Sequence, residues 1–418
     1  MNDDKEKLLA IDAIQKKLLG KKLSYPEVYA IMDEIAKEKL SDVLTTYFVA
    51  SSFKEGYTSQ ELFFFTKAMV ETGNKLKFKG IVADKHSVGG IAGTRTTMII
   101  VPIIAAAGFK IPKISSRAIT TPAGTADVME SIASVEFTPK QIEKIVNEVG
   151  GCIAWNGKLG IAPADDIIIR VEEPLSFESF DKIIISVMAK KVAAGTTHLV
   201  LDIPIGKTAK IHRFSEGENV ARKFENLARH FGIKVICDVN ETLEPAGRGI
   251  GPILEARDVL YVLEQKTDRP LRLEAKSLRL AGKLLDLCYK EQKINKNGED
   301  EAKKILESGI ALKKFQEIVK AQGGDHNITS ESLSLAKYKF DFHSFISGKI
   351  KDINNYNLNT VAKILGAPND KKAGIYLLKK LDHSILKDEP MFTLYSEDKY
   401  LLKEAEATLR NLPVFKIE

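Results

Sequence analysis

Cysteine is scarce in this sequence of 418 residues, and the few that occur argue against two classes of protein. There are three, Cys152, Cys237 and Cys288, which lie far apart and form no CxxC pair. An odd number at such spacing argues against a disulfide framework and against a zinc cluster. We therefore expect no metal site, and we expect the reducing cytoplasm as the location.

The chain also lacks a hydrophobic run long enough to cross a bilayer. The longest, Met98 to Phe109, is interrupted by Pro102 and is too short to span. The first residues, MNDDKEK, are charged and lack the apolar core of a secretory signal. A net charge of +6 is mild for this length, so it fits a small acidic substrate without requiring nucleic acid. We expect neither nucleic acid nor a membrane as a partner.

The two common nucleotide-binding signatures, GxxxxGK and GxGxxG, are absent as well. In their place is a stretch from Asp84 to Thr125 that begins after the apolar run at residues 80–83. We interpret that run as the end of a strand, followed by a glycine-rich turn and an apolar helix that ends near Gly108. Such a succession gathers backbone N–H groups and a positive helix end at one place, which predicts an oxyanion site.

Lysine and small hydroxyl side chains accompany this stretch. Lys85 and Ser87 lie in its first part, and a second loop, which Pro122 and Gly124 shape, contributes further groups: Ser115, Ser116, Arg117, Thr120, Thr121 and Thr125. Two anion-binding loops joined by one helix predict a site for two charged groups, or for one phosphate and a sugar. The alternative is that the hydroxyls only cap helices and turns.

Hydrophobic periodicity indicates regions of different structure along the chain. Residues 1–76 contain two capping boxes, Ser24-x-x-Glu27 and Thr58-x-x-Glu61, and apolar residues at three-to-four spacing, which predict packed helices. Short apolar strands then alternate with helices, which predicts a mostly parallel sheet. Alternation in Met391–Tyr395 suggests a small terminal domain. We expect an α/β fold with a small all-helical lobe, a larger mostly parallel α/β lobe and a C-terminal α+β domain.

The motifs resemble those of one known family. KHSVGG, a following ISSR segment and an AGT turn are similar to the KHSTGG, ISGRG and GGT of the thymidine and pyrimidine-nucleoside phosphorylases. The variant SSRAITTPAGTAD, together with GCIAWNGKLGIAPADD, resembles the AMP phosphorylase branch of that family. The similarity covers most of the chain, and the combination of motifs is specific.

The resemblance implies lobes that are discontinuous in sequence, with the substrate in a cleft between them. Residues 1–76 and 160–195 would form the helical lobe, which makes the dimer contact and faces the base. Residues 77–159 and 196–335 would form the phosphate-binding lobe, and residues 336–418 the terminal domain. A homodimer or larger homo-oligomer is implied. Members of this branch usually carry a further amino-terminal domain, so this chain is either naturally short or trimmed.

The implied reaction is reversible phosphorolysis of nucleoside 5′-monophosphates, in which AMP and phosphate give adenine and α-D-ribose 1,5-bisphosphate. The residues leave the choice among AMP, CMP and UMP open. The reaction needs a phosphate fixed beside the anomeric carbon, a proton for the departing base and exclusion of water. No metal or organic cofactor is expected, because inorganic phosphate is the co-substrate.

The resemblance also assigns roles residue by residue. The positions that match the family's phosphate contacts are Lys85, Ser87, Ser115 and Thr125, with Thr97 a weaker match. The positions that match its substrate contacts are Gly90, Ser116, Arg117, Ala118, Ile119, Thr120, Thr121, Thr125, Ser186, Lys190 and Lys210. Arg95 is an additional candidate for the 5′-phosphate.

Glu178 matches the proton-donating aspartate of the AMP branch, with a reach longer by one methylene. A carboxylic acid that faces a purine can protonate a ring nitrogen as the base leaves. His86, between Lys85 and Ser87, is a second candidate acid, and Asp181 is a third. An ordinary glutamate in a helix's first turn is the alternative reading of Glu178.

Other functions remain as alternatives. A thymidine or pyrimidine-nucleoside phosphorylase is disfavoured by the ISSRAITTP loop. A phosphoribosyltransferase of similar architecture would need acidic residues for magnesium, and only Asp84 and Asp127 lie near the loops. A catalytically inactive dimer used for binding is disfavoured because the lysines and hydroxyls of the loops are intact.

Overall fold

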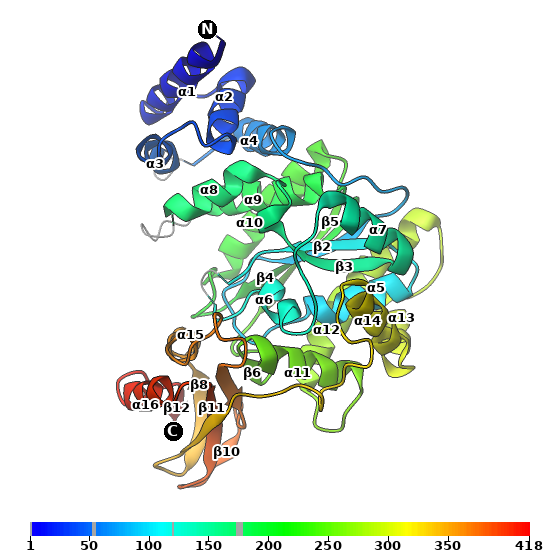
Figure 1. Ribbon diagram of the computed structural model, residues 1–418, viewed down its shortest axis with the longest axis vertical. Helices are drawn as coiled ribbons and strands as arrows, with labels where there is room; N and C mark the ends of the chain where they lie inside the picture. Colours follow the sequence, from blue (N-terminus) through cyan, green and yellow to red (C-terminus); the bar gives the residue numbers. More distant parts are fainter. Residues whose placement is uncertain (1, 52–55, 119–120, 173–178) are drawn as a thin grey trace.

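The computed structural model describes residues 2–51, 56–118, 121–172 and 179–418. A helical lobe lies at one end, a central α/β lobe follows, and a small terminal domain with the C-terminus lies at the other end (Figure 1). The expected fold class is confirmed. No helix in the described ranges is long and apolar enough to cross a membrane.

The helical lobe combines segments from two parts of the chain. Its helices are α1 (Asn2–Leu18), α2 (Tyr25–Ala36), α3 (Asp42–Ser51), α4 (Ser59–Glu71), α8 (Pro163–Glu172) and α9 (Phe180–Ala193). The capping box at α4 is present, because Glu61 N–H donates to Thr58 Oγ1 and Thr58 N–H donates to Glu61 Oε2. α8 packs on α2 and α3, and α9 packs on α4.

The central lobe holds the parallel strands. They are β1 (Ala83–Ser87), β4 (His198–Ile205) and β5 (Lys234–Glu241) in one sheet, and β2 (Ile111–Ser115) and β3 (Gly151–Trp155) in another. A parallel bridge between Val82 and Lys110 joins the two. The first strand therefore does not end near Ala83 as the sequence suggested. It begins there, and Lys85, His86 and Ser87 are strand residues, because β1 pairs with β4 as far as Ser87.

Helices cover both faces of these sheets. They are α5 (Thr97–Ala106), α6 (Thr125–Glu130), α7 (Pro139–Val149), the short 3-10 helix η1 (Asn156–Lys158), α10 (Phe214–His230), α11 (Pro252–Leu263), α12 (Leu271–Gln292), α13 (Gly298–Glu307) and α14 (Ile310–Ala321). β4 is buried throughout. Leu199 and Leu201 join the core shared with the helical lobe, whereas Val200 joins the core beneath α5 and α12. Burial on both faces explains its continuous apolar sequence.

The terminal domain is antiparallel. One sheet has the order β6 (Gly249–Ile250), β9 (Gly374–Leu377), β11 (Pro390–Ser396) and β7 (Tyr338–His343). The other has the order β10 (Ser384–Ile385), β8 (Gly348–Ile353) and β12 (Phe415–Ile417), and the helices are α15 (Asn355–Ile364) and α16 (Lys399–Thr408). Because β6 comes from the central lobe's chain, this pairing fixes the terminal domain to that lobe.

Candidate active site

A cavity of about 730 Å³ lies between the helical lobe and the carboxyl ends of the parallel strands. β1 and β2 contribute to its wall at their ends, which is where open parallel sheets place ligands. α9 lines the opposite side, and α15 of the terminal domain contributes Tyr356 and Lys363. All three parts of the chain therefore meet at one cavity.

Most of the site residues expected from the sequence lie on this wall. They are Lys85, His86, Ser87, Gly90, Thr97, Ser115, Ser116, Arg117, Thr121, Thr125, Ser186, Lys190 and Lys210. Ala118 lines a neighbouring cavity of about 240 Å³ together with Ser116, Arg117 and Lys190. Ile119, Thr120 and Glu178 lie outside the described residues.

The first part of the site is organised by a buried carboxylate on the neighbouring strand. Asp202 stands opposite Ser87 in the β1–β4 register and accepts a hydrogen bond of 2.9 Å from its hydroxyl. Its other oxygen accepts from Asn240 at 2.8 Å and lies 3.0 Å from Lys276 Nζ. Burial alone would raise the pKa of Asp202, but Lys276 and Lys85 hold it below its ordinary value.

Lys85 is buried at the same place, and burial lowers the pKa of its ammonium to about 8 while Asp202 opposes the fall. The group is therefore still mostly protonated at neutral pH. A desolvated ammonium beside a hydroxyl is suited to hold an oxyanion strongly, since few water molecules compete for it.

The second loop is held by Arg95. Its Nη1 donates to Thr125 Oγ1 at 3.0 Å, and its Nη2 donates to the carbonyl of Ala123 at 2.8 Å. Glu255, which is buried, lies 2.6 Å from Nη2. The guanidinium therefore anchors the loop and takes one lone pair of the Thr125 hydroxyl, which leaves its proton to be donated elsewhere.

Arg117 also forms ion pairs and a cation–π contact with other side chains. Its Nη2 lies 2.5 Å from Glu130 and 3.3 Å from Glu136, and its guanidinium lies 4.3 Å from the Trp155 ring centroid. Two carboxylates therefore share the charge of the guanidinium, and Arg117 also lines the cavity. Both arginines near the loops thus have protein partners that contribute to the loops' shape, and both line the cavity.

Gly90 connects the first loop to the loop that bears Lys210. Its φ is +98°, and a Cβ there would lie 3.0 Å from Lys210 N and 3.1 Å from Lys210 Cγ. The close backbone approach therefore requires glycine.

On the opposite side of the cavity, α9 presents polar groups in successive turns. Lys190 Nζ lies 2.6 Å from Asp165 Oδ2, and the Ser186 hydroxyl donates to the same oxygen at 2.9 Å. Lys190 therefore pairs with Asp165, which lies on α8. Nearer the start of α9, Lys182 pairs with Glu172 at 2.6 Å.

Two of the candidate acids are disfavoured by their surroundings. Asp181 is buried, accepts from Tyr57 N–H at 2.8 Å, pairs with Lys223 and does not line the cavity. Burial lowers the pKa of His86 well below its ordinary value, and Lys191 and Lys113 lower it further. A neutral imidazole at this position can donate an N–H but is a poor source of a full proton.

The carboxylates that could have held magnesium near the loops have protein partners. Asp84 pairs with Lys191 at 2.7 Å. Asp127 accepts from the N–H groups of Gly124 and Ala118 and pairs with Lys371 at 2.9 Å. Both positions thus serve the structure of the loops.

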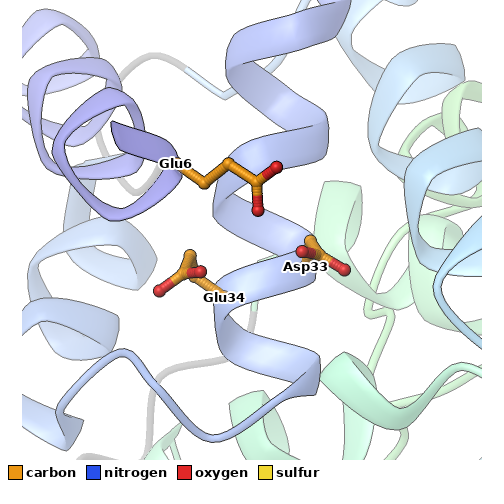
Figure 2. A group of neighbouring side chains, drawn as sticks. All are labelled: Glu6, Asp33 and Glu34. Carbon is orange, nitrogen blue, oxygen red and sulfur yellow. The ribbon is translucent and has the colours of Figure 1, made fainter. Parts of the chain in front are cut away.

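One acidic group elsewhere has metal-like geometry. Within the described ranges, Glu6, Asp33 and Glu34 bring carboxylate oxygens within 4.8 Å of one another (Figure 2). The group lies between α1 and α2 of the helical lobe, none of its members lines the cavity, and Asp33 pairs with Lys37 at 2.5 Å. It is separate from the site.

Comparison with known proteins adds decisive information. AMP phosphorylase 1 of Archaeoglobus fulgidus is 42% identical over 95% of this chain and 78% of its own length. AMP phosphorylase of Methanocaldococcus jannaschii is 41% identical over 99% of this chain and 82% of its own. The chain belongs to the AMP phosphorylase branch of the thymidine and pyrimidine-nucleoside phosphorylase family. A putative thymidine phosphorylase of Legionella pneumophila is 41% identical over 97% of the chain and 77% of its own.

The family models agree with membership in the wider family. Residues 11–73 match the helical bundle domain of a glycosyl transferase family, and residues 79–250 match its a/b domain. Residues 349–415 match the pyrimidine nucleoside phosphorylase C-terminal domain. Anthranilate phosphoribosyltransferase of Thermus thermophilus superposes with a TM-score of 0.62 at 18% identity, covering 75% of this chain and 100% of its own, which shows a shared fold.

Several wall residues of this AMP phosphorylase-branch chain were missed in the sequence. The charged ones are Lys113, Asp165, Glu172, Lys182, Lys191, Asp202, Lys276 and Lys363, and the apolar ones from the helical lobe include Met32, Phe48, Tyr57, Phe65 and Met69. Asp202 could have been found, because it interrupts a continuous apolar run of the kind typical of a buried parallel strand. The others depend on contacts between distant segments.

Proposed function

We propose that this protein catalyses the reversible phosphorolysis of nucleoside 5′-monophosphates, with AMP as the leading substrate. One observation carries the proposal: the loops that match the family's phosphate and nucleotide contacts line one cavity with a strongly cationic wall. Among the described residues, ten Lys and Arg side chains and three carboxylates line it. An excess of positive charge suits two phosphate-bearing substrates.

In the proposed reaction, an oxygen of inorganic phosphate bonds to C1′ of the ribose as the bond from C1′ to the base breaks. Lys85, Ser87, Ser115 and Thr125 hold the phosphate, and the departing base takes the electron pair. Glu178 supplies the proton to a ring nitrogen. The products are adenine and ribose 1,5-bisphosphate. The lysines neutralise the phosphate charge, so the proposal includes no metal or organic cofactor.

The ion pairs on α9 support the placement of the base on that side. Ser186 and Lys190 face the cavity opposite the loops, next to apolar side chains of the helical lobe such as Ile183. A wall that is apolar with a few polar groups suits a flat heterocycle.

A homo-oligomer built through the helical lobe is part of the proposal. Large apolar side chains are exposed on and next to α1 and α3, namely Leu8, Leu18, Leu19, Val43 and Tyr47. Clustered apolar exposure of this kind is typical of a surface covered by a partner. The free thiols of Cys152, Cys237 and Cys288 are compatible with the cytoplasm.

The test is a phosphate-dependent base-release assay with AMP, CMP, UMP, adenosine and thymidine in parallel. We expect phosphate-dependent release of adenine from AMP at a higher kcat/KM than from adenosine. Lys85→Met should abolish release, and Lys110→Met, a lysine outside the cavity, should not. Rapid cleavage of thymidine with none of AMP would refute the proposal in favour of the nucleoside alternative.

A further inference from the structure

Three charged side chains are buried together beneath the phosphate loops. Asp84 on β1, Lys113 on β2 and Lys191 on α9 have exposed fractions of 0%, 4% and 1%. Lys191 Nζ lies 2.7 Å from Asp84 Oδ2. Lys113 Nζ lies 3.7 Å from Oδ1 and donates to the carbonyl of Ile114 at 2.7 Å. The carboxylate is therefore paired closely with one lysine and only loosely with the other.

The remaining contacts of Asp84 reinforce this imbalance. Its Oδ1 already accepts from the N–H of Lys85 at 2.7 Å, and the Thr196 hydroxyl lies 3.5 Å from Oδ2. Two buried ammonium groups beside one carboxylate would carry a net charge of +1. A buried charge without its own counter-ion is costly, so the favoured outcome is loss of a proton.

Lys113 is the group that loses it. Burial lowers the pKa of Lys113 well below its ordinary value, and Lys191 and Lys85 lower it further, while Asp84 opposes them. His86 of β1 also faces this group and is itself neutral. The neighbours of Lys113 on β1 and α9 are therefore the cationic Lys85 and Lys191, the uncharged His86 and the anionic Asp84.

The position of Lys113 points to what would restore its charge. It lines the cavity together with Lys85 and Lys191. Side chains two apart on a strand share a face, so Lys113 is on the same face of β2 as Ser115, a candidate phosphate contact. An oxyanion held by that hydroxyl would supply the missing negative charge.

We propose that Lys113 is a further lysine of the phosphate site, neutral while no oxyanion is bound and protonated when one enters, so that binding takes up a proton. The proton passes from solvent or buffer to the free amine, which becomes an ammonium ion, and no other bond changes. The inference rests on the proposed function only in that the cavity binds phosphate.

Titration calorimetry measures this directly. Sulfate is the first probe, because it stays a dianion near neutral pH, and inorganic phosphate is the second. Each titration is repeated in buffers of different ionisation enthalpy, and the slope gives the number of protons taken up. We expect the wild-type protein to take up a larger fraction of a proton than Lys113→Met, which should also bind sulfate about tenfold more weakly or worse.

Two variants sharpen the result. Lys113→Arg keeps a permanent charge, so it should bind sulfate with little loss and without the additional proton uptake. Lys110→Met is the matched control: Lys110 directly precedes β2, its ammonium lies 5.9 Å from the Phe78 ring centroid, and it does not line the cavity. It should match the wild type in affinity and proton count.

Equal proton counts in wild type and Lys113→Met, or sulfate dissociation constants within twofold of each other, overturn the proposal. If Lys113→Met does not fold, Lys113→Arg and the pH dependence of sulfate binding by the wild type replace it. A wild-type affinity that is constant from pH 6 to 9 also overturns the proposal.

Competition identifies which phosphate meets Lys113. Sulfate displaced by inorganic phosphate assigns the free co-substrate, and sulfate displaced by AMP alone assigns the 5′-phosphate. None of these titrations requires turnover. Proton uptake without AMP cleavage would therefore refute the proposed reaction and leave this inference standing.

Discussion

Replacing Arg95 by methionine should lower both the stability of the fold and the order of the second phosphate loop. Arg95 joins the buried Glu255, at 2.6 Å, to Thr125 Oγ1 and the carbonyl of Ala123. Removing one partner of a buried ion pair costs about 3–5 kcal/mol. Burial already raises the pKa of Glu255, and Arg95 opposes the rise. Without Arg95, the carboxyl group should take up a proton, and the thermal unfolding midpoint should fall.

The effect of the variant on phosphate binding by the loop should differ in size from its effect on unfolding. Thr125 would lose the donor that orients its hydroxyl, and a hydrogen bond to a charged group contributes about 1.5–3 kcal/mol. That free energy corresponds to a fall of about 10- to 150-fold in kcat/KM for phosphate. Steady-state kinetics with phosphate varied at saturating AMP measure it, and calorimetry measures the unfolding.

The double variant Arg95→Met with Glu255→Met distinguishes the two effects. Two apolar side chains in place of a buried ion pair often recover the lost stability. The unfolding midpoint should therefore return toward that of the wild type, while kcat/KM for phosphate stays low because Thr125 and Ala123 remain without their donor. Recovery of kcat/KM together with stability would refute the reasoning, as would a single variant that is unchanged in both.

Two further predictions concern proton transfer and charge. Because Lys85 has a pKa of about 8, its charge is lost as the pH rises, so kcat/KM for phosphate should fall above about pH 8, where phosphate itself no longer titrates; Lys85→Arg should move this limb to higher pH, and an unmoved limb would assign it to another group. Glu178→Gln should lower kcat for AMP far more than it weakens AMP binding, as single-turnover kinetics and equilibrium binding would show, and an unchanged rate would remove the acid role from Glu178.

Local patterns in the sequence predicted much of the fold. The capping box at Thr58 and Glu61 forms as expected, and the apolar run that begins at His198 is a fully buried parallel strand. The apolar run at residues 80–83 was interpreted as the end of a strand, but the ladder between β1 and β4 begins only at Ala83 and continues to Ser87, so Ile81 and Val82 lie outside it. Hydrophobicity indicates burial and says little about hydrogen-bond register.

The charge network of the site could not be predicted in the same way. Lys276 reaches Asp202 from α12, and Lys190 reaches Asp165 from another helix. Such pairs depend on how separate elements pack, and no periodicity along one element encodes them. For the same reason, the pairing of Arg117 with Glu130 and Glu136 could not be predicted from the sequence.

The ion pair between Lys191 and Asp84 has a mechanical consequence. It connects the last turn of α9 to the first parallel strand, so the helical lobe and the α/β lobe are held together at that point. Lys182 lies nine residues earlier on the same helix, about 13 Å away at 1.5 Å per residue. A rotation of α9 by about 10° around this ion pair would shift Lys182 by about 2 Å and hardly move the end of the strand. Opening of the cleft would then widen the space for the heterocycle and hardly change the binding site of the attacking phosphate.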